Sequence, residues 1–243
     1  MNTRLIQCTC HACGKVFDLL QREAVGSWWP TGGLCDACDD EAIRVANLRR
    51  DRDGVPFWRK RWLSLTPVEF QVPIERARLP DAAAFDRALR WTEKNERASL
   101  LLVGDTGLGK TRALYALLAQ ILTRRPAITI ERYNCITFGE TAREKSYQGK
   151  GAEWFERLRT VDFVIFDDLF RGVLIDQIQE ELFGLVSVRT ENRLPILATT
   201  QFTADTLEKS GVLKGHHAAA ITRRLREYFE VVKFKKPPTK ETP

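Results

Sequence analysis

Short apolar runs alternate with longer amphipathic stretches over the last two thirds of the chain. The runs 161–166 and 194–200 suit strands buried on both faces, as in parallel sheets. The apolar run 99–103 also predicts a strand, 229–234 is strand-like, and a further strand is expected at about 128–133. Apolar residues recur every three to four positions, as on surface helices packed against a sheet, at about 81–94, 112–123, 152–159 and 177–190. This alternation predicts a three-layer α/β domain.

A phosphate-binding pattern, G-x-x-x-x-G-K-T, directly follows the run at 99–103. Glycines such as Gly107 and Gly109 allow backbone conformations that turn N–H groups and a helix N-terminus toward the β- and γ-phosphates. Lys110 supplies a positive charge, and the Thr111 hydroxyl can ligate Mg²⁺. The residues predicted to bind ATP or ADP are Gly104, Asp105, Thr106, Gly107, Leu108, Gly109, Lys110, Thr111 and Arg112.

Polar residues at the ends of two later strands are candidates for the rest of this site. Ligands of open α/β sheets lie at the carboxyl ends of strands. Asp167, which follows the run at 161–166, is therefore expected to bind Mg²⁺ opposite Thr111, and Asp168 to polarise the attacking water. Gln201 follows the run at 194–200, and we expect it to contact the γ-phosphate or the water, the alternative being an ordinary loop residue.

Taken together, these segments resemble the AAA+ ATPases of the DnaC and DnaI helicase-loader type and the related IstB transposition helpers. The resemblance covers roughly residues 79–235. Besides the phosphate loop, it rests on the strand end Asp167-Asp168-Leu169, the segment 189–195 and the step Arg223-Arg224-Leu225 before the last strand. It implies ATP hydrolysis by an oligomer. It also places Gln201 at the first sensor position, where the family usually has Asn.

The resemblance also implies roles for two arginines. Arg224 occupies the position of an arginine finger, and the family usually has Ser where this chain has Arg223. Arg189 matches an arginine that can face the neighbouring nucleotide, although a plain helix-end cation is an equal alternative. Most AAA+ proteins continue into a helical lid, whereas only 235–243 follow the last expected strand here. We therefore expect a lidless domain whose site is completed by the next protomer.

Two C-x-x-C pairs lie near the N-terminus, with twenty-one residues between them. The spacing fits tetrahedral zinc bound by Cys10, Cys13, Cys35 and Cys38. An aromatic stretch that can form a hairpin lies between the pairs, and a helix is expected at 39–50, so a treble-clef-like unit is predicted. Cys8 or His11 could replace Cys10. Disulfides are disfavoured because there is no secretory signal, and Cys135 is expected to be a small buried hydrophobe.

Composition and charge divide the chain into four expected parts. These are a zinc-binding module at 1–50, a linker at 51–78, the ATPase domain at 79–235 and a basic tail at 236–243. Prolines and mixed charge favour a linker that lies on the ATPase domain. Its segment Trp58-Arg-Lys-Arg-Trp62 could stack nucleic-acid bases, but we favour anchoring to that domain. No apolar run is long enough to span a membrane, so a soluble, cytoplasmic protein is expected.

The net charge of +6 is uneven along the chain. Residues 223–243 hold seven Lys and Arg against three acids, which suits attraction for single-stranded DNA, although a solubilising tail is an equal alternative. Lys145, Tyr147 and Lys150 form a second candidate DNA contact. Residues 1–50 hold six Lys and Arg against six acids, which favours protein docking over nucleic-acid binding. By the resemblance, the docking partner is a replicative helicase.

The sequence therefore favours one function over two alternatives. The leading hypothesis is an ATP-dependent helicase loader, encoded by a phage or prophage, that places a replicative helicase on single-stranded DNA. The alternatives are an IstB-like transposition helper and a low-turnover adaptor in which ATP gates a protein contact. All three share the ATPase domain, so its residues do not discriminate between them.

Overall fold

The computed structural model describes residues 3–9, 15–24, 27–28, 55–94, 99–171, 176–213 and 215–236. Contacts divide the chain into two compact units, Met1–Arg61 with Leu122–Ala127 and Trp62–Ile121 with Ile128–Pro243. The four predicted zinc ligands and the helix expected at 39–50 lie outside the described residues. The zinc site therefore remains a prediction.

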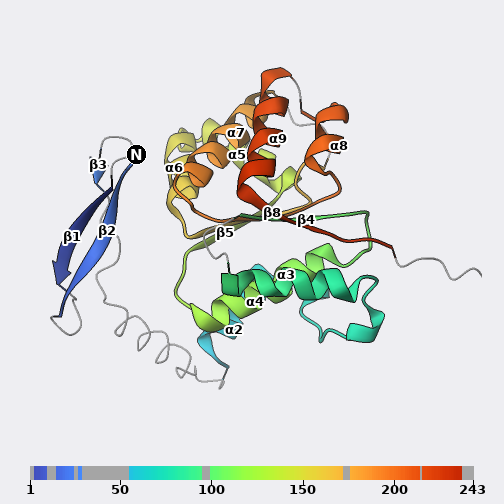
Figure 1. The fold of residues 1–243 in the computed structure, drawn as a ribbon. Coiled ribbons are helices and arrows are strands. Elements are labelled where there is room, and N and C mark those ends of the chain that lie inside the picture. Colours follow the sequence, from blue (N-terminus) through green and yellow to red (C-terminus); the bar gives the residue numbers. More distant parts are fainter. Residues whose placement is uncertain are drawn as a thin grey trace, which may run out of the picture. The chain divides into compact units, whose positions relative to one another are not determined.

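The described part of the N-terminal unit contains a three-stranded antiparallel sheet (Figure 1). Its strands are β1 (Thr3–Thr9), β2 (Val16–Ala24) and β3 (Ser27–Trp28). β1 pairs with β2 over its whole length, from Thr3 opposite Arg22 to Thr9 opposite Val16. The hairpin of β2 and β3 falls between the two cysteine pairs in the sequence.

The second unit contains a five-stranded parallel sheet in the order β5-β6-β7-β4-β8. The strands are β4 (Ser99–Val103), β5 (Ile130–Asn134), β6 (Phe163–Asp167), β7 (Ile196–Thr200) and β8 (Phe229–Lys233). All five strands predicted from the apolar runs are thus confirmed. β4 lies inside the sheet between β7 and β8, so the phosphate loop leaves the sheet near the ends of β6 and β7.

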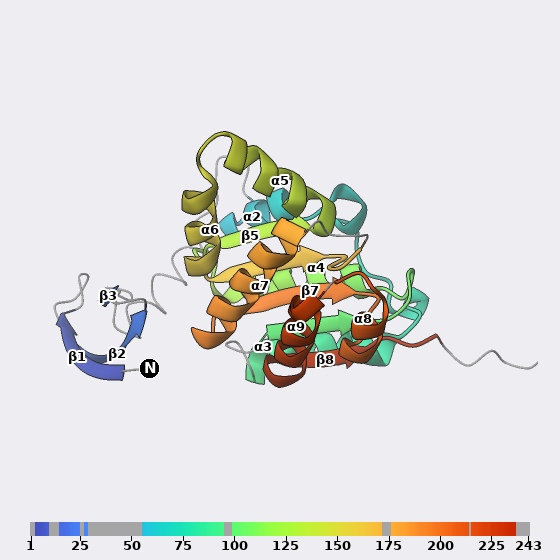
Figure 2. The ribbon, with the colours of Figure 1, turned by 90° about the horizontal axis from the view of Figure 1, so that it is seen from above.

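Helices cover both faces of this sheet, which confirms the predicted three-layer α/β fold (Figures 1 and 2). α3 (Ala82–Lys94) and α4 (Lys110–Arg124) lie on one face. The other face carries α5 (Cys135–Tyr147), α6 (Gly151–Thr160), α7 (Asp176–Glu191), α8 (Ala204–Lys209) and α9 (Gly215–Tyr228). None of the helices that the structure describes is long and apolar enough to cross a membrane.

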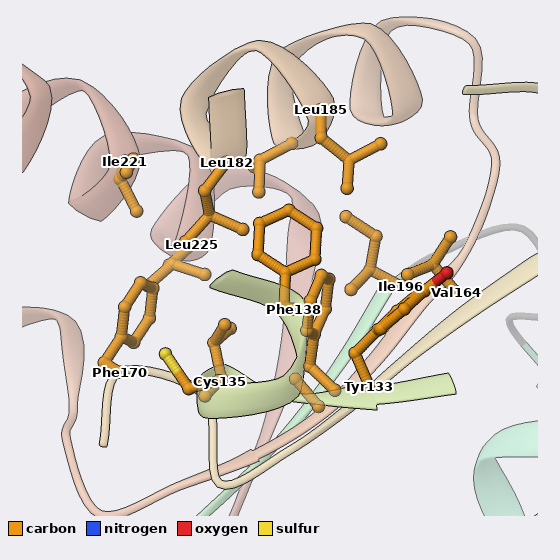
Figure 3. Close-up of a cluster of buried hydrophobic side chains, with 14 of the residues drawn as sticks. Tyr133, Cys135, Phe138, Val164, Phe170, Leu182, Leu185, Ile196, Ile221 and Leu225 are labelled. Atoms are coloured by element: carbon orange, nitrogen blue, oxygen red, sulfur yellow. The ribbon is translucent and has the colours of Figure 1, made fainter. Parts of the chain in front are cut away.

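The core beneath α5–α9 is largely aromatic (Figure 3). Phe138 of α5 lies at its centre, with ring centroids 5.7 Å from Tyr133, 5.4 Å from Trp154 and 5.2 Å from Phe166. Edge-to-face and tilted arrangements of this kind add to the stabilisation from apolar burial. Cys135 is buried in the same core, as predicted.

The predicted linker contains α2 (Phe57–Leu65) and two short 3₁₀ helices, η1 (Val68–Phe70) and η2 (Arg76–Arg78). The indole Nε1 of Trp62 donates to the carbonyl of Tyr115 at 2.8 Å. Phe70 stacks on the Tyr115 ring, with 5.6 Å between the ring centroids. The segment after Trp62 is therefore anchored on α4, which supports the anchoring interpretation for this tryptophan.

Arg189 has a role that the sequence did not indicate. Its side chain is fully buried, and Nη1 donates to the carbonyls of Leu158 at 2.7 Å and Val161 at 2.8 Å. Nη2 donates to the carbonyls of Asp162 at 3.1 Å and Pro195 at 2.9 Å. Burial lowers the pKa of Arg189 to about 9, so the guanidinium stays charged at neutral pH. The buried guanidinium does not face a neighbouring nucleotide. Arg189 lies in the last turn of α7, as the helix-end alternative had it, and it joins the end of α6 to the starts of β6 and β7.

We predict that Arg189→Met lowers the free energy of unfolding by about 3 kcal/mol or more, because four buried carbonyl groups lose their donor. Urea unfolding of the full chain, followed by circular dichroism, measures the change. Arg143→Met is the matched control, since Arg143 is exposed on α5 and its loss is expected to change the value by less than about 0.5 kcal/mol. Equal unfolding midpoints for the two variants would contradict the structural role.

Candidate nucleotide site

The glycine-rich loop is held between the ends of three strands. The N–H of Gly104 donates to the carbonyl of Thr200 at 3.2 Å, and the N–H of Phe234 donates to the carbonyl of Val103 at 2.7 Å. A Cβ atom at Gly104 would lie 2.5 Å from the Phe234 carbonyl oxygen, so no larger residue fits there. Gly109 has a φ of 90°, a conformation that favours glycine. The sequence of the loop is therefore dictated by the close approach of β8 as well as by phosphate binding.

Lys110 begins α4 and is almost completely buried, with 5% of its surface exposed. Its Nζ donates to the carbonyl of Asp105 at 2.8 Å, across the loop. Burial lowers the pKa of Lys110, while the nearby carboxylates of Asp168, Asp167 and Asp105 oppose that change. A cation held inside the loop by backbone and surrounded by acids is suited to bind phosphate oxygens.

Asp167, at the end of β6, is the centre of a cluster of hydroxyl groups. Its Oδ1 accepts hydrogen bonds from Thr111 Oγ1 at 2.9 Å and from Thr199 Oγ1 at 2.7 Å. Burial raises the pKa of the Asp167 carboxyl, and the two hydroxyl donors oppose this by stabilising the carboxylate. The structure thus brings together the two residues that were predicted to bind Mg²⁺.

This donor set fits magnesium. Mg²⁺ in nucleotide sites takes one or two protein ligands and completes its shell with water and phosphate oxygens. Among the described residues, no group of three or more His, Cys, Asp or Glu could hold a metal by itself. A site formed by Thr111 and Asp167 would therefore depend on the nucleotide phosphates for its remaining ligands.

Asp168 follows in a left-handed conformation, with a φ of 56°. Its N–H donates to Thr199 Oγ1 at 2.8 Å, and its carboxylate forms an ion pair with Arg171 at 2.9 Å. A hollow beside this turn is lined by Asp168, Leu169, Phe170, Arg171, Gln201 and Phe202. The amide Nε2 of Gln201 donates to Thr106 Oγ1 of the phosphate loop at 3.1 Å. Asp168 and Gln201 thus line one hollow, and Gln201 also bonds the phosphate loop.

A second hollow brings the predicted residue Arg112 together with residues that the sequence analysis did not assign to the site. It is lined by Val72, Pro73, Glu75, Arg78, Leu79 and Arg112. The segment 72–78 had been placed in the linker because of its prolines and charges. The segment lines the hollow because the chain packs beside Gly109, where a Cβ atom would lie 4.0 Å from Leu79 Cδ2.

Arg224, the predicted arginine finger, lies apart from these groups on α9. Its guanidinium is 5.1 Å from the centre of the Phe183 ring and 3.4 Å from the Glu191 carboxylate. Both partners belong to α7 of the same chain. In the described part of the chain, Arg224 therefore contacts α7 of its own chain.

Comparisons with known proteins agree with this fold. A family model for the bacterial DnaA ATPase domain matches residues 77–215. The chromosomal replication initiator protein DnaA of Deinococcus deserti is 30% identical over 101 residues, which are 42% of this chain and 22% of that protein. This chain thus spans about a fifth of the length of that relative.

Solved structures with this fold include DnaA and a helicase loader. AMPPCP-bound DnaA from Aquifex aeolicus has a TM-score of 0.55 at 14% identity, over 70% of this chain and 51% of that one. DnaA bound to AMPPCP and single-stranded DNA has a TM-score of 0.52 at 18% identity, over 72% of this chain and 50% of that one. The DnaC helicase loader has a TM-score of 0.54 at 17% identity, over 72% of this chain and 99% of that one. At these identities the likeness concerns the fold alone.

The family match covers more than half of the chain and includes the phosphate loop, β6 and β7. The strand order and the grouping of Lys110, Thr111, Asp167 and Asp168 are in keeping with a nucleotide-dependent enzyme of this kind. The chain belongs to the family of the bacterial DnaA ATPase domain.

Proposed function

We propose that this chain is an ATP-dependent helicase loader that docks a replicative helicase and places it on single-stranded DNA. The observation that carries the ATP-dependent step is the cluster of Thr111, Asp167 and Thr199 behind the phosphate loop. The loader role is supported by the fold likeness to the DnaC helicase loader. It is supported as well by the two C-x-x-C pairs, which resemble the zinc-bearing N-terminal module of DnaI-type loaders.

In the proposed reaction, the loop binds the nucleotide phosphates through its N–H groups and Lys110. Thr111 and Asp167 hold Mg²⁺, which neutralises charge on the β- and γ-phosphates when it is bound. Asp168 orients the water, and Gln201, already bonded to the loop at Thr106, contacts the γ-phosphate side. Binding thus depends mainly on the loop, while Asp168 acts on the step of hydrolysis.

Arg224 completes the site of a neighbouring protomer in this proposal. Within its own chain, the side chain of Arg224 is 14% exposed and its ion pair with Glu191 is long, at 3.4 Å. An ion pair with an exposed carboxylate contributes little stability, so the arginine can leave it when a neighbour's nucleotide approaches. A guanidinium suits the charge that develops on phosphoryl oxygens.

DNA contacts are proposed on two basic segments. Tyr147 is 94% exposed at the end of α5, close in sequence to Lys145 and Lys150. An exposed aromatic ring between cations can stack on a base while the cations attract phosphates. The basic residues from Arg223 to the C-terminus supply further attraction. A solved DnaA structure with single-stranded DNA bound has the same fold, which supports the proposal.

We predict that Lys110→Ala and Asp168→Asn separate binding from hydrolysis. Loss of the buried cation should weaken ATP binding at least about a hundredfold, whereas Asp168→Asn should leave affinity within about threefold and slow turnover at least about a hundredfold. Fluorescence titration with a labelled ATP analogue and phosphate-release assays measure the two effects. Lys209→Ala, at an exposed lysine on α8, is the control. Equal loss of binding in Lys110→Ala and Asp168→Asn would overturn the assigned roles.

The same phosphate-release assay tests Arg224. Arg224→Ala should bind ATP normally and hydrolyse it slowly, because a finger arginine is worth on the order of a thousandfold in turnover. Mixing this variant with Lys110→Ala should restore part of the activity, since mixed oligomers pair an intact loop with an intact arginine. Hydrolysis by Arg224→Ala at the rate of the wild type, with single-stranded DNA present, would exclude the finger role.

The docking proposal is tested on the full chain with the replicative helicase of the genome that encodes it. We predict one zinc per chain by metal analysis, together with co-purification of the helicase. Cys10→Ser combined with Cys13→Ser should lose both, because thiolate ligation couples zinc binding to folding of the module. Cys8→Ser is the matched control and should keep both. A chain without zinc would refute the metal site, and retention of a transposase instead of the helicase would favour the IstB-like alternative.

A further inference from the structure

We propose that Thr199 is a positioning residue of the ATPase site, which fixes the Asp167 carboxylate for Mg²⁺ and the Asp168 backbone for hydrolysis. The inference rests on the proposed ATP-dependent function. Apart from Arg224, the predicted residues of the ATPase site come from the phosphate loop and from the ends of β6 and β7. Thr199 lies within β7, in a run that was counted only as a buried strand.

The strand register places Thr199 beside Asp167. In the parallel pair of β6 and β7, Phe166 lies opposite Ala198, so the next residues, Asp167 and Thr199, follow in the same register. Successive side chains of a strand point to opposite faces. Phe166 and Ala198 belong to the core under α5–α9, which puts Asp167 and Thr199 on the α4 side, with Thr111.

One hydroxyl group serves both acidic residues. Thr199 Oγ1 donates its proton to Asp167 Oδ1 at 2.7 Å and accepts a hydrogen bond from the Asp168 N–H at 2.8 Å. A hydroxyl has one proton to donate, so these two bonds fix its orientation. Thr199 is also completely buried. The carbonyl of the same threonine accepts from the N–H of Leu169 at 2.8 Å, which adds a third bond to the turn.

These bonds matter because the turn after β6 is not held by regular structure. Asp168 and Phe170 both have positive φ values, 56° and 68°, which non-glycine residues adopt only when their surroundings impose it. Thr199 supplies part of that constraint. Thr111 donates to the same carboxylate oxygen and is itself assigned to Mg²⁺, so Thr199 is the partner that keeps Asp167 in place when Thr111 turns to the metal.

Thr200 provides a matched control on the next position of the same strand. It is also buried, 1% exposed, and its hydroxyl donates to the carbonyl of Leu169 at 2.7 Å. Its side chain points to the opposite face from Thr199, away from Asp167. Thr200→Val therefore removes a buried hydroxyl from β7 without touching either acidic side chain.

The test measures ATP hydrolysis by the full chain as a function of Mg²⁺ concentration, and ATP affinity in the presence of a chelator. For Thr199→Val we expect the Mg²⁺ concentration at half-maximal rate to rise about tenfold, the effect of losing a hydrogen bond to a charged group. Affinity without Mg²⁺ should stay within about twofold of the wild type. Thr199→Ser, which keeps the hydroxyl, should restore the Mg²⁺ requirement, and Thr200→Val should leave it unchanged.

Three results would overturn the inference. A Thr199→Val protein with the Mg²⁺ requirement of the wild type would show that the hydroxyl does not position Asp167. An equal rise in Thr200→Val would show a general effect of lost buried hydroxyls. A Thr199→Ser protein that keeps the raised Mg²⁺ requirement would count against the role of the hydroxyl. If Thr199→Val lowers the urea midpoint, the same Mg²⁺ titration is made with Thr199→Ala. A wild-type chain without Mg²⁺-dependent ATP binding would instead refute the proposed function itself.

Discussion

The site depends on one oxygen of Asp167, which accepts hydrogen bonds from two hydroxyl groups. It joins three segments that are far apart in the sequence: the start of α4, the end of β6 and the end of β7. The strand order makes this possible, because β7 lies between β6 and β4. The loop is thereby linked to Asp167 through Thr111 and to Gln201 through Thr106. Without this junction, the loop would be a glycine-rich turn that carries a lysine.

Two buried cations, Arg189 and Lys110, and the partly buried Asp167 show how the chain balances burial against function. Burying a charge is unfavourable unless hydrogen bonds or opposite charges compensate it. The guanidinium of Arg189 is compensated by four backbone carbonyls and fixes the packing of α6, β6 and β7. Lys110 and Asp167 are compensated by groups that a bound nucleotide and its metal could partly replace. The free-energy cost of burying charge is therefore offset at Arg189 by backbone groups of the fold, and at Lys110 and Asp167 by groups that a ligand could replace.

Much of the fold could be predicted because strong local patterns coincide with it. The runs 99–103, 161–166 and 194–200 correspond to the inner strands β4, β6 and β7, and the glycine loop lies between β4 and α4. α5 was not predicted, since its apolar residues are few and interrupted by small and polar ones. Its capping box, in which Asn134 and Thr137 bond each other's backbone, was the available signal.

Other features could not be read from the sequence because they depend on contacts between distant segments. The burial of Arg189 requires four carbonyls, from the end of α6 and from the connections that precede β6 and β7, and no local pattern indicates it. The hollow beside Arg112 forms only when the segment 72–79 returns to the loop. Thr199 was hidden in an apolar strand, and its importance follows from the register of β6 and β7.

The central claim, that Asp167 binds the metal of a Mg–ATP complex, is tested most directly by ATP affinity with and without Mg²⁺ in the wild type and in Asp167→Asn. Asparagine keeps the shape and can still accept the bonds from Thr111 and Thr199, but it carries no charge. The account predicts that Mg²⁺ strengthens ATP binding by the wild type about tenfold or more, and that Asp167→Asn loses this gain while binding without Mg²⁺ is retained. An equal gain from Mg²⁺ in both proteins would contradict it.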